Sequence, residues 1–204
     1  TDQREALLQT DLSLICVGTP SQPTGDLDLT SVIRVCEAIG QALKNKSTRH
    51  LVVVRSTMLP GSMEGSVIPT LECFSGKPAG AGFGVAINPE FLRESSAIHD
   101  FYYPPKTVIG ALDETDARTV ASLYEKIDAP LLLTSLKTAE MIKYTDNIFH
   151  ALKVVFGNEI GLICKQMGVD SDEVMEIFCQ DQKLNLSPAY LKPGFAFGGS
   201  CLPK

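Results

Sequence analysis

The sequence contains no tryptophan, only three histidines and no long apolar run among its 204 residues. A membrane-spanning helix needs about 20 consecutive apolar residues, so we expect no contact with a bilayer. The histidines are far apart, which gives no indication of a zinc site. Lysine and arginine do not cluster and the formal net charge is −6, so a nucleic-acid partner is not expected.

The N-terminus is polar and lacks a signal-peptide pattern. The six cysteines form no C-x-x-C pair, and they are too sparse for a disulfide-stapled secreted domain. Free thiols in a cytoplasmic protein are therefore expected. The cysteines are Cys16, Cys36, Cys73, Cys164, Cys179 and Cys201.

The first two thirds of the sequence alternate short apolar runs with helix-like segments. Continuous apolar strands separated by helices are typical of an α/β fold with a parallel sheet covered on both faces. We therefore predict a partial Rossmann-like sheet with flanking helices, whose ligands bind at the carboxyl ends of the strands. The expected strands are Leu12–Val17, Leu51–Val54, Val85–Ile87, Thr107–Ile109 and Pro130–Thr134.

Three helices are expected between these strands. The first is Leu29–Leu43, with Asp28 as its cap. The second begins near Gly61 and runs towards Cys73, and the third is Asp113–Ile127. The segment Asn88–Asp100 is expected to form a loop or a short helix.

The pattern changes after residue 135. Leu136–Met167 contains no proline and is about 45 Å long if it is one helix. Its apolar residues surround much of its circumference, which is typical of a helix buried between domains or subunits. A shorter helix, Ser171–Phe178, follows, and then a loop rich in glycine and proline. We expect residues 1–135 to form part of one domain and residues 136–204 a helical domain that supports a homodimer.

A narrow polar stripe interrupts the apolar surface of the long helix. Five residues fall within about 80° of its circumference: Glu140, Lys143, Asn147, His150 and Asn158. The stripe is either a solvated face or a set of groups that meet a ligand, because buried polar groups need partners. One lysine among amides and an imidazole favours the orientation of hydroxyls and of a developing negative charge.

Five short motifs resemble those of the UDP-glucose/GDP-mannose dehydrogenase family, and they occur in one order from about residue 10 to residue 204. They are VGTP at 17–20, RSTMLPG at 55–61, NPEFLRE with Glu90 and Glu94, AEMIKYTDN with Lys143 and Asn147, and FGGSCLPK with Cys201. The resemblance implies an NAD-dependent oxidation of a nucleotide sugar from a primary alcohol to an acid, with four electrons transferred. The runs CQDQKLNLS and PGFAFGGSCLPK favour oxidation of GDP-mannose to GDP-mannuronate, for an acidic polysaccharide such as alginate. Oxidation of UDP-glucose to UDP-glucuronate is the alternative.

The resemblance also implies a catalytic role for each motif. Cys201 would attack the intermediate aldehyde to give a thiohemiacetal and then a thioester. Lys143 and Asn147 would stabilise the oxyanion. Glu94 would position the hydrolytic water with support from Glu90, and Thr57 would hold a water or the reacting hydroxyl. The remaining five cysteines are expected to be inert, buried thiols.

Binding residues follow from the same resemblance. Those expected at the cofactor are Thr19, Thr57, Glu94 and Lys204. Those expected at the nucleotide sugar are Glu94, Lys143, Asn147, His150, Asn158, Tyr190, Lys192, Phe195 and Gly198.

The sequence departs from the family in several respects. The resemblance implies a second, C-terminal nucleotide-binding domain that does not occur in it, and Lys192 stands where related enzymes usually have arginine. A G-x-G-x-x-G turn after a strand, which holds a cofactor pyrophosphate, does not occur in it. We therefore expect a fragment that binds NAD poorly and is inactive by itself. Two other hypotheses remain: a non-catalytic oligomerisation module, which needs neither Cys201 nor Lys143, and a two-electron dehydrogenase, which needs no thiol.

Overall fold

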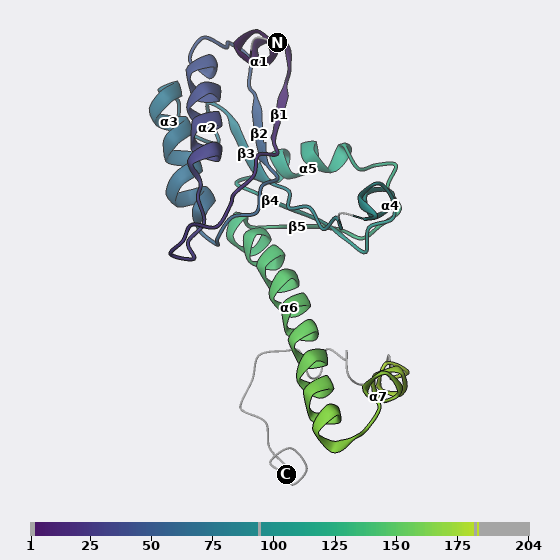
Figure 1. Cartoon of the computed structure of the whole chain (residues 1–204). Helices are drawn as coiled ribbons and strands as arrows, with labels where there is room; N and C mark the ends of the chain where they lie inside the picture. Colours follow the sequence, from purple (N-terminus) through teal and green to yellow (C-terminus); the bar gives the residue numbers. More distant parts are fainter. Residues whose placement is uncertain (1–2, 94, 182, 184–204) are drawn as a thin grey trace, which may run out of the picture. The chain divides into compact units, whose positions relative to one another are not determined.

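A computed structural model describes residues 3–93, 95–181 and 183, and Figure 1 shows the order of its elements. The chain divides into two compact units, Thr1–Ile148 and Phe149–Lys204. No described helix is both long and apolar enough to span a membrane. The predicted fold class is confirmed: a mostly parallel sheet carries flanking helices and is followed by one long helix.

The first unit contains a five-stranded sheet in the order β1-β2-β3-β4-β5. The strands are β1 (Leu12–Ile15), β2 (Leu51–Val54), β3 (Gly84–Ile87), β4 (Thr107–Ala111) and β5 (Leu131–Thr134). Every strand predicted from the sequence is present, with ends shifted by up to two residues.

The prediction of a wholly parallel sheet is wrong at one place, because β3 and β4 pair antiparallel through Ala86–Ala111 and Ile87–Gly110. A parallel connection needs a crossover of a dozen or more residues, usually a helix, that carries the chain back to the starting edge. Among the described residues between β3 and β4, the only helix is α4 (Ala97–Tyr102), which has six residues. It is too short to carry the chain back, so β4 and β5 run opposite to the first three strands.

The flanking helices are close to those predicted. They are α2 (Thr30–Leu43), η1 (Met63–Val67), α3 (Ile68–Ser75) and α5 (Glu114–Ser122), and a helix that was not predicted, α1 (Gln3–Gln9), precedes them. Helix α2 begins one residue later than expected, and Asp28 accepts the Thr30 backbone N–H at 2.8 Å. Helix α5 ends five residues earlier than expected, at Ser122.

Side chains alternate between the two faces of the sheet, as the two-residue repeat of a strand requires. Val52 and Val54 join a core cluster with buried residues of α2 and α3, whereas Leu51 and Val53 join a second cluster with α5. Figure 1 shows α2 and α3 together on one side of the strands, away from α5. The two edge strands depart from the prediction of full burial: residues 131–133 of β5 are exposed, as is Leu14 of β1.

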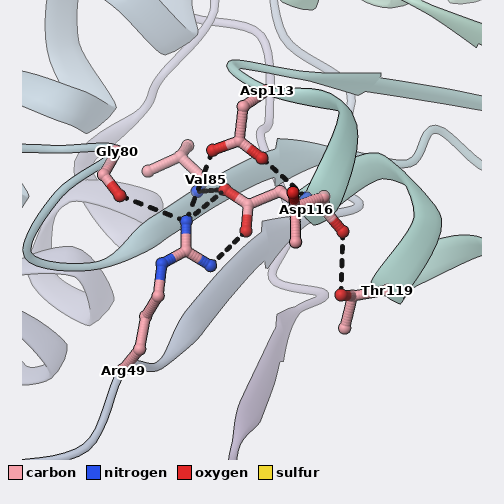
Figure 2. Close-up of polar contacts among 7 residues, drawn as sticks. Arg49, Gly80, Val85, Asp113, Asp116 and Thr119 are labelled. Atoms are coloured by element: carbon pink, nitrogen blue, oxygen red, sulfur yellow. Dashed lines mark hydrogen bonds and ion pairs between the residues drawn. The ribbon is translucent and has the colours of Figure 1, made fainter.

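A partly buried charge network joins β3 to α5, and its buried member, Asp116, also accepts the Val85 backbone N–H at 3.3 Å (Figure 2). Asp116 of α5 is fully buried and pairs with Arg49, while Asp113 caps the helix by accepting the Asp116 N–H at 2.8 Å. Figure 2 also shows Arg49 donating to the Gly80 carbonyl, at 3.2 Å. A Cβ at Gly84 would collide with the Asp116 carboxylate, so this strand position requires glycine.

The long helix α6 (Leu136–Met167) has the predicted bounds, and so does α7 (Ser171–Phe178). Within the second unit, the rings of Phe156 and Phe178 lie 5.5 Å apart. In the single chain the apolar surface of α6 is not covered, since Leu152 is 59% exposed, and burial of this helix between domains or subunits stays a prediction. Other exposed apolar residues of α6 are Met141, Ile148, Val154, Val155, Phe156, Leu162, Ile163 and Met167.

Candidate functional site

The carboxyl ends of β1, β2 and β3 border a cavity of about 420 Å³. Ligands of open α/β sheets bind at this edge, because the loops that follow parallel strands meet there. The cavity is lined by Cys16, Val17, Gly18, Thr19, Arg55, Ser56, Thr57, Glu90 and Leu92. Two predicted cofactor residues, Thr19 and Thr57, therefore lie in one cavity with the predicted catalytic residue Glu90.

Hydroxyl groups tie the loops after β1 and β2 together. Ser56 Oγ donates to the Val17 carbonyl at 2.5 Å, and Thr19 Oγ1 donates to the Thr57 carbonyl at 2.7 Å. Each of these hydroxyl protons is engaged by backbone. The two loops therefore form one fixed wall of the cavity.

Glu90 connects the cavity to the long helix. Its Oε2 accepts the Leu92 backbone N–H at 2.7 Å, and its Oε1 lies 3.3 Å from Lys143 Nζ. Lys143 is only 8% exposed, and its ammonium lies 5.5 Å from the centre of the Phe91 ring. A lysine that is mostly buried against an aromatic ring and one carboxylate is held in place for an electrostatic role.

Asp100 holds the loop that carries Glu90. Its carboxylate accepts the Arg93 backbone N–H at 3.0 Å, Arg93 Nε at 3.0 Å and Arg93 Nη2 at 2.6 Å. It also accepts the Ser96 hydroxyl at 2.9 Å. Hydrogen bonding with the Arg93 guanidinium keeps the pKa of Asp100 well below its usual range. The carboxylate therefore fixes the loop on both sides of position 94, which lies outside the described residues.

Glu140 belongs to the polar stripe, for which contact with a ligand was one explanation, but its carboxylate binds backbone groups instead. It is 1% exposed and accepts the backbone N–H groups of Gly61 at 2.6 Å and Met63 at 2.8 Å. Burial raises the pKa of this carboxyl. Gly61 has φ +94°, a conformation that glycine adopts without strain. Glu140 thus joins the start of α6 to the turn before α3, and of the stripe only Lys143 reaches Glu90.

The other stripe residues, Asn147, His150 and Asn158, are exposed. The remaining predicted site residues lie outside the described residues: Glu94, Tyr190, Lys192, Phe195, Gly198, Cys201 and Lys204. The structure therefore brings together Thr19, Thr57, Glu90 and Lys143 and leaves their relation to Cys201 a prediction.

Sequence reasoning missed two residues of the cavity wall. Cys16 was expected to be buried and inert, yet it is exposed and lines the cavity; Cys73 and Cys179 are exposed too. Arg55 was regarded only as part of a turn. The signal that could have identified Cys16 and Arg55 is their position, since each follows the last residue of a strand at the carboxyl edge.

The cavity fits part of a dinucleotide in position and in chemistry. It lies at the strand edge where such ligands bind, and Arg55 Nε is a buried donor without a partner in the structure. A ligand oxygen would supply the missing acceptor.

Comparison with protein families gives two matches that together cover most of the chain. Residues 1–128 match the NAD-binding domain of the UDP-glucose/GDP-mannose dehydrogenase family, and residues 137–204 match its central domain. Among curated proteins, GDP-mannose 6-dehydrogenase of Azotobacter vinelandii is 59% identical over all 204 residues, which cover 47% of that protein. A UDP-glucose 6-dehydrogenase of Haloferax volcanii is 37% identical over 209 aligned positions, covering all of this chain and 48% of that protein.

Comparison with solved structures gives the same family of enzymes. A crystal structure of a ternary complex of GDP-mannose dehydrogenase from Pseudomonas aeruginosa matches with a TM-score of 0.95 and 57% identity, over 98% of this chain and 46% of that one. A UDP-glucose dehydrogenase from Pyrobaculum islandicum matches with a TM-score of 0.84 and 43% identity, over 98% and 45% of the two chains. The chain spans about half the length of the curated relatives it matches. The chain belongs to the UDP-glucose/GDP-mannose dehydrogenase family.

Proposed function

We propose that the protein is an NAD-dependent nucleotide-sugar 6-dehydrogenase that catalyses the four-electron oxidation of GDP-mannose to GDP-mannuronate. The observation that carries the proposal is the Lys143–Glu90 pair, in which Glu90 also lines the cavity at the carboxyl ends of the strands. A cation beside the hydride-transfer site is what an alcohol oxidation needs, because negative charge develops on the substrate oxygen.

The cofactor would lie against Thr19 and Thr57 in this cavity, with Glu94 and Lys204 also contributing. When bound, NAD supplies the hydride acceptor for each of the two oxidations. Thr57 would hold the reacting hydroxyl or a water. The engagement of the Thr19 side chain with the Thr57 carbonyl keeps that wall in place while ligands enter and leave.

The substrate chemistry would use the residues to which the family motifs point. In the first oxidation the alcohol loses a hydride and a proton to give an aldehyde. The Cys201 thiolate then adds to the aldehyde carbon, and loss of a second hydride gives a thioester that water hydrolyses to the acid and free thiol. Lys143 and Asn147 would stabilise the oxyanion formed on thiol addition and on hydrolysis, and Glu94, supported by Glu90, would orient the water.

One feature of the relatives supports GDP-mannose over UDP-glucose. The similarity to GDP-mannose 6-dehydrogenase is 59%, against 37% for the UDP-glucose enzyme quoted above. The segment that would contact the sugar nucleotide includes Tyr190, Lys192, Phe195 and Gly198, together with His150 and Asn158 of α6. Such an enzyme would act in the cytoplasm and would supply the uronate for an acidic polysaccharide such as alginate.

We further propose that residues 1–135 contribute to the NAD-binding domain and residues 136–204 to a central domain, and that two copies pair through α6. Exposed apolar side chains on α6 support the pairing, because such side chains gain from being covered by a partner.

The experiment is NADH formation by the protein at the full length of its relatives, with a panel of GDP- and UDP-sugars. Two NADH per GDP-mannose are expected. Cys201→Ser should abolish net acid formation, and a matched variant, Cys73→Ser, should retain it. A steady rate in Cys201→Ser, or the absence of NADH with every sugar, would contradict the proposal.

A further inference from the structure

Arg55 differs from three other arginines of the first unit. The guanidinium groups of Arg49, Arg93 and Arg118 each pair with a carboxylate. Arg55 follows β2 and lines the 420 Å³ cavity, and it also lines a second cavity of about 30 Å³ with Asn88 and Tyr124. Its Nε is buried and lacks a hydrogen-bond partner, and the side chain forms no ion pair with any described residue.

Buried polar groups in native proteins are almost always paired, so the lone Arg55 donor indicates a partner that binds in the cavity. Three other polar side chains of the wall are already engaged. Ser56 and Thr19 donate to backbone carbonyls, and Glu90 accepts from Leu92 and Lys143. Arg55 and the Thr57 hydroxyl are left to donate to a ligand oxygen, and of the two only Arg55 carries a charge.

The charge of Arg55 has a second consequence. Glu90, the carboxylate of the cavity wall, is paired with Lys143, so the described wall leaves the positive charge of Arg55 uncompensated. An oxidised nicotinamide ring is positively charged, whereas the reduced ring is neutral. In a partly enclosed site, like charges repel more strongly than they do in water.

We propose that Arg55 is a cofactor-binding residue that donates to an oxygen of the nicotinamide half of the dinucleotide and favours the reduced over the oxidised form. This inference rests on the proposed function, which brings the nicotinamide to this cavity. A site that stabilises the reduced cofactor makes removal of hydride from the substrate more favourable. Arg55 thus shifts the equilibrium of the bound cofactor towards its reduced form, as both oxidations require.

The test is a binding measurement on the full-length protein, without substrate. NADH is titrated by the change in its own fluorescence, and NAD is titrated by competition against NADH. Arg55→Gln keeps hydrogen-bond donors and removes the charge, so the ratio of the two dissociation constants should move about fivefold in favour of NAD. Arg55→Lys keeps the charge and should retain the wild-type ratio. Arg118→Gln, an exposed arginine paired with Glu114, is the matched control and should change nothing.

An unchanged ratio in Arg55→Gln overturns the inference, and so does an equal change in Arg55→Lys. If the wild-type protein binds neither form, the proposed function fails and the inference fails with it. If it binds both forms with a ratio that Arg55→Gln leaves unaltered, only the inference fails.

Discussion

The reactivity of Cys16 should report whether the cavity is occupied. It is an exposed, free thiol in the wall that would contact the cofactor. We expect saturating NAD to slow its alkylation by iodoacetamide about tenfold, because a ligand in the cavity would cover the sulfur. Cys73 is the control, since it is equally exposed but lies on α3 away from the cavity. Peptide mass spectrometry measures the alkylation rates of Cys16 and Cys73 separately. Equal rates at Cys16 with and without NAD would place the cofactor elsewhere.

His50 should make the stability of the fold depend on pH. Its Nδ1 lies 2.9 Å from the Thr10 carbonyl, which can only accept, so Nδ1 carries the proton and Nε2 accepts from the Ser13 hydroxyl at 2.8 Å. Burial lowers the pKa of His50 below its ordinary 6.5. The unfolded chain therefore binds a proton at a higher pH than the folded chain, and stability should fall as pH decreases below about 6.5.

The variant that tests this is His50→Asn, whose amide can donate to Thr10 but does not titrate. Urea unfolding at pH 7.5 and pH 5.5 should show a smaller loss of stability for the variant than for the wild type. Parallel losses in both proteins would exclude His50 as the cause.

At the scale of elements, Glu140 determines how α6 begins. Its buried carboxylate accepts two backbone N–H groups from the turn before α3, so Glu140→Ala would leave both donors without their partner. We expect a loss of about 1–3 kcal/mol in the free energy of unfolding. Glu64→Ala is the matched control, because Glu64 forms only an exposed pair with Lys137 at 2.6 Å and should cost less than about 1 kcal/mol. Chemical denaturation measures both, and equal losses would show that the buried carboxylate has no special role.

The elements also show what sequence patterns can and cannot establish. All five strands and the long helix were predictable, because short apolar runs between turn residues and a long apolar stretch without proline are local signals. The antiparallel pairing of β4 was not, because it depends on where the chain re-enters the sheet. The role of Glu140 was also hidden: helical spacing places it beside Lys143 on one stripe, but its partners at Gly61 and Met63 are about 80 residues away.

At the scale of the molecule, family motifs pointed to more of the residues that the fold brings together than periodicity did. Thr19, Thr57, Glu90 and Lys143 come from four segments between residues 19 and 143, and only the fold brings them together. The positions of Arg55 and Cys16 at strand ends could have indicated the cavity, but the exposure of Cys16 and the missing partner of Arg55 Nε needed the structure.

The proposed homodimer gives the last prediction. Ile148, Leu152 and Val155 follow at helical spacing on α6, and each is more than half exposed in the single chain. A helix face of this kind is stable in water when a second copy covers it. Leu152→Glu would place a charge in such a contact without a paired partner, and we expect the dimer to dissociate at least tenfold more readily. Lys165→Glu, at an exposed polar position of the same helix, should leave assembly unchanged. Sedimentation velocity over a concentration series separates the two outcomes. If Leu152→Glu sediments as the wild type does, α6 is not the dimer contact, and its exposed apolar residues must be covered by other parts of the protein.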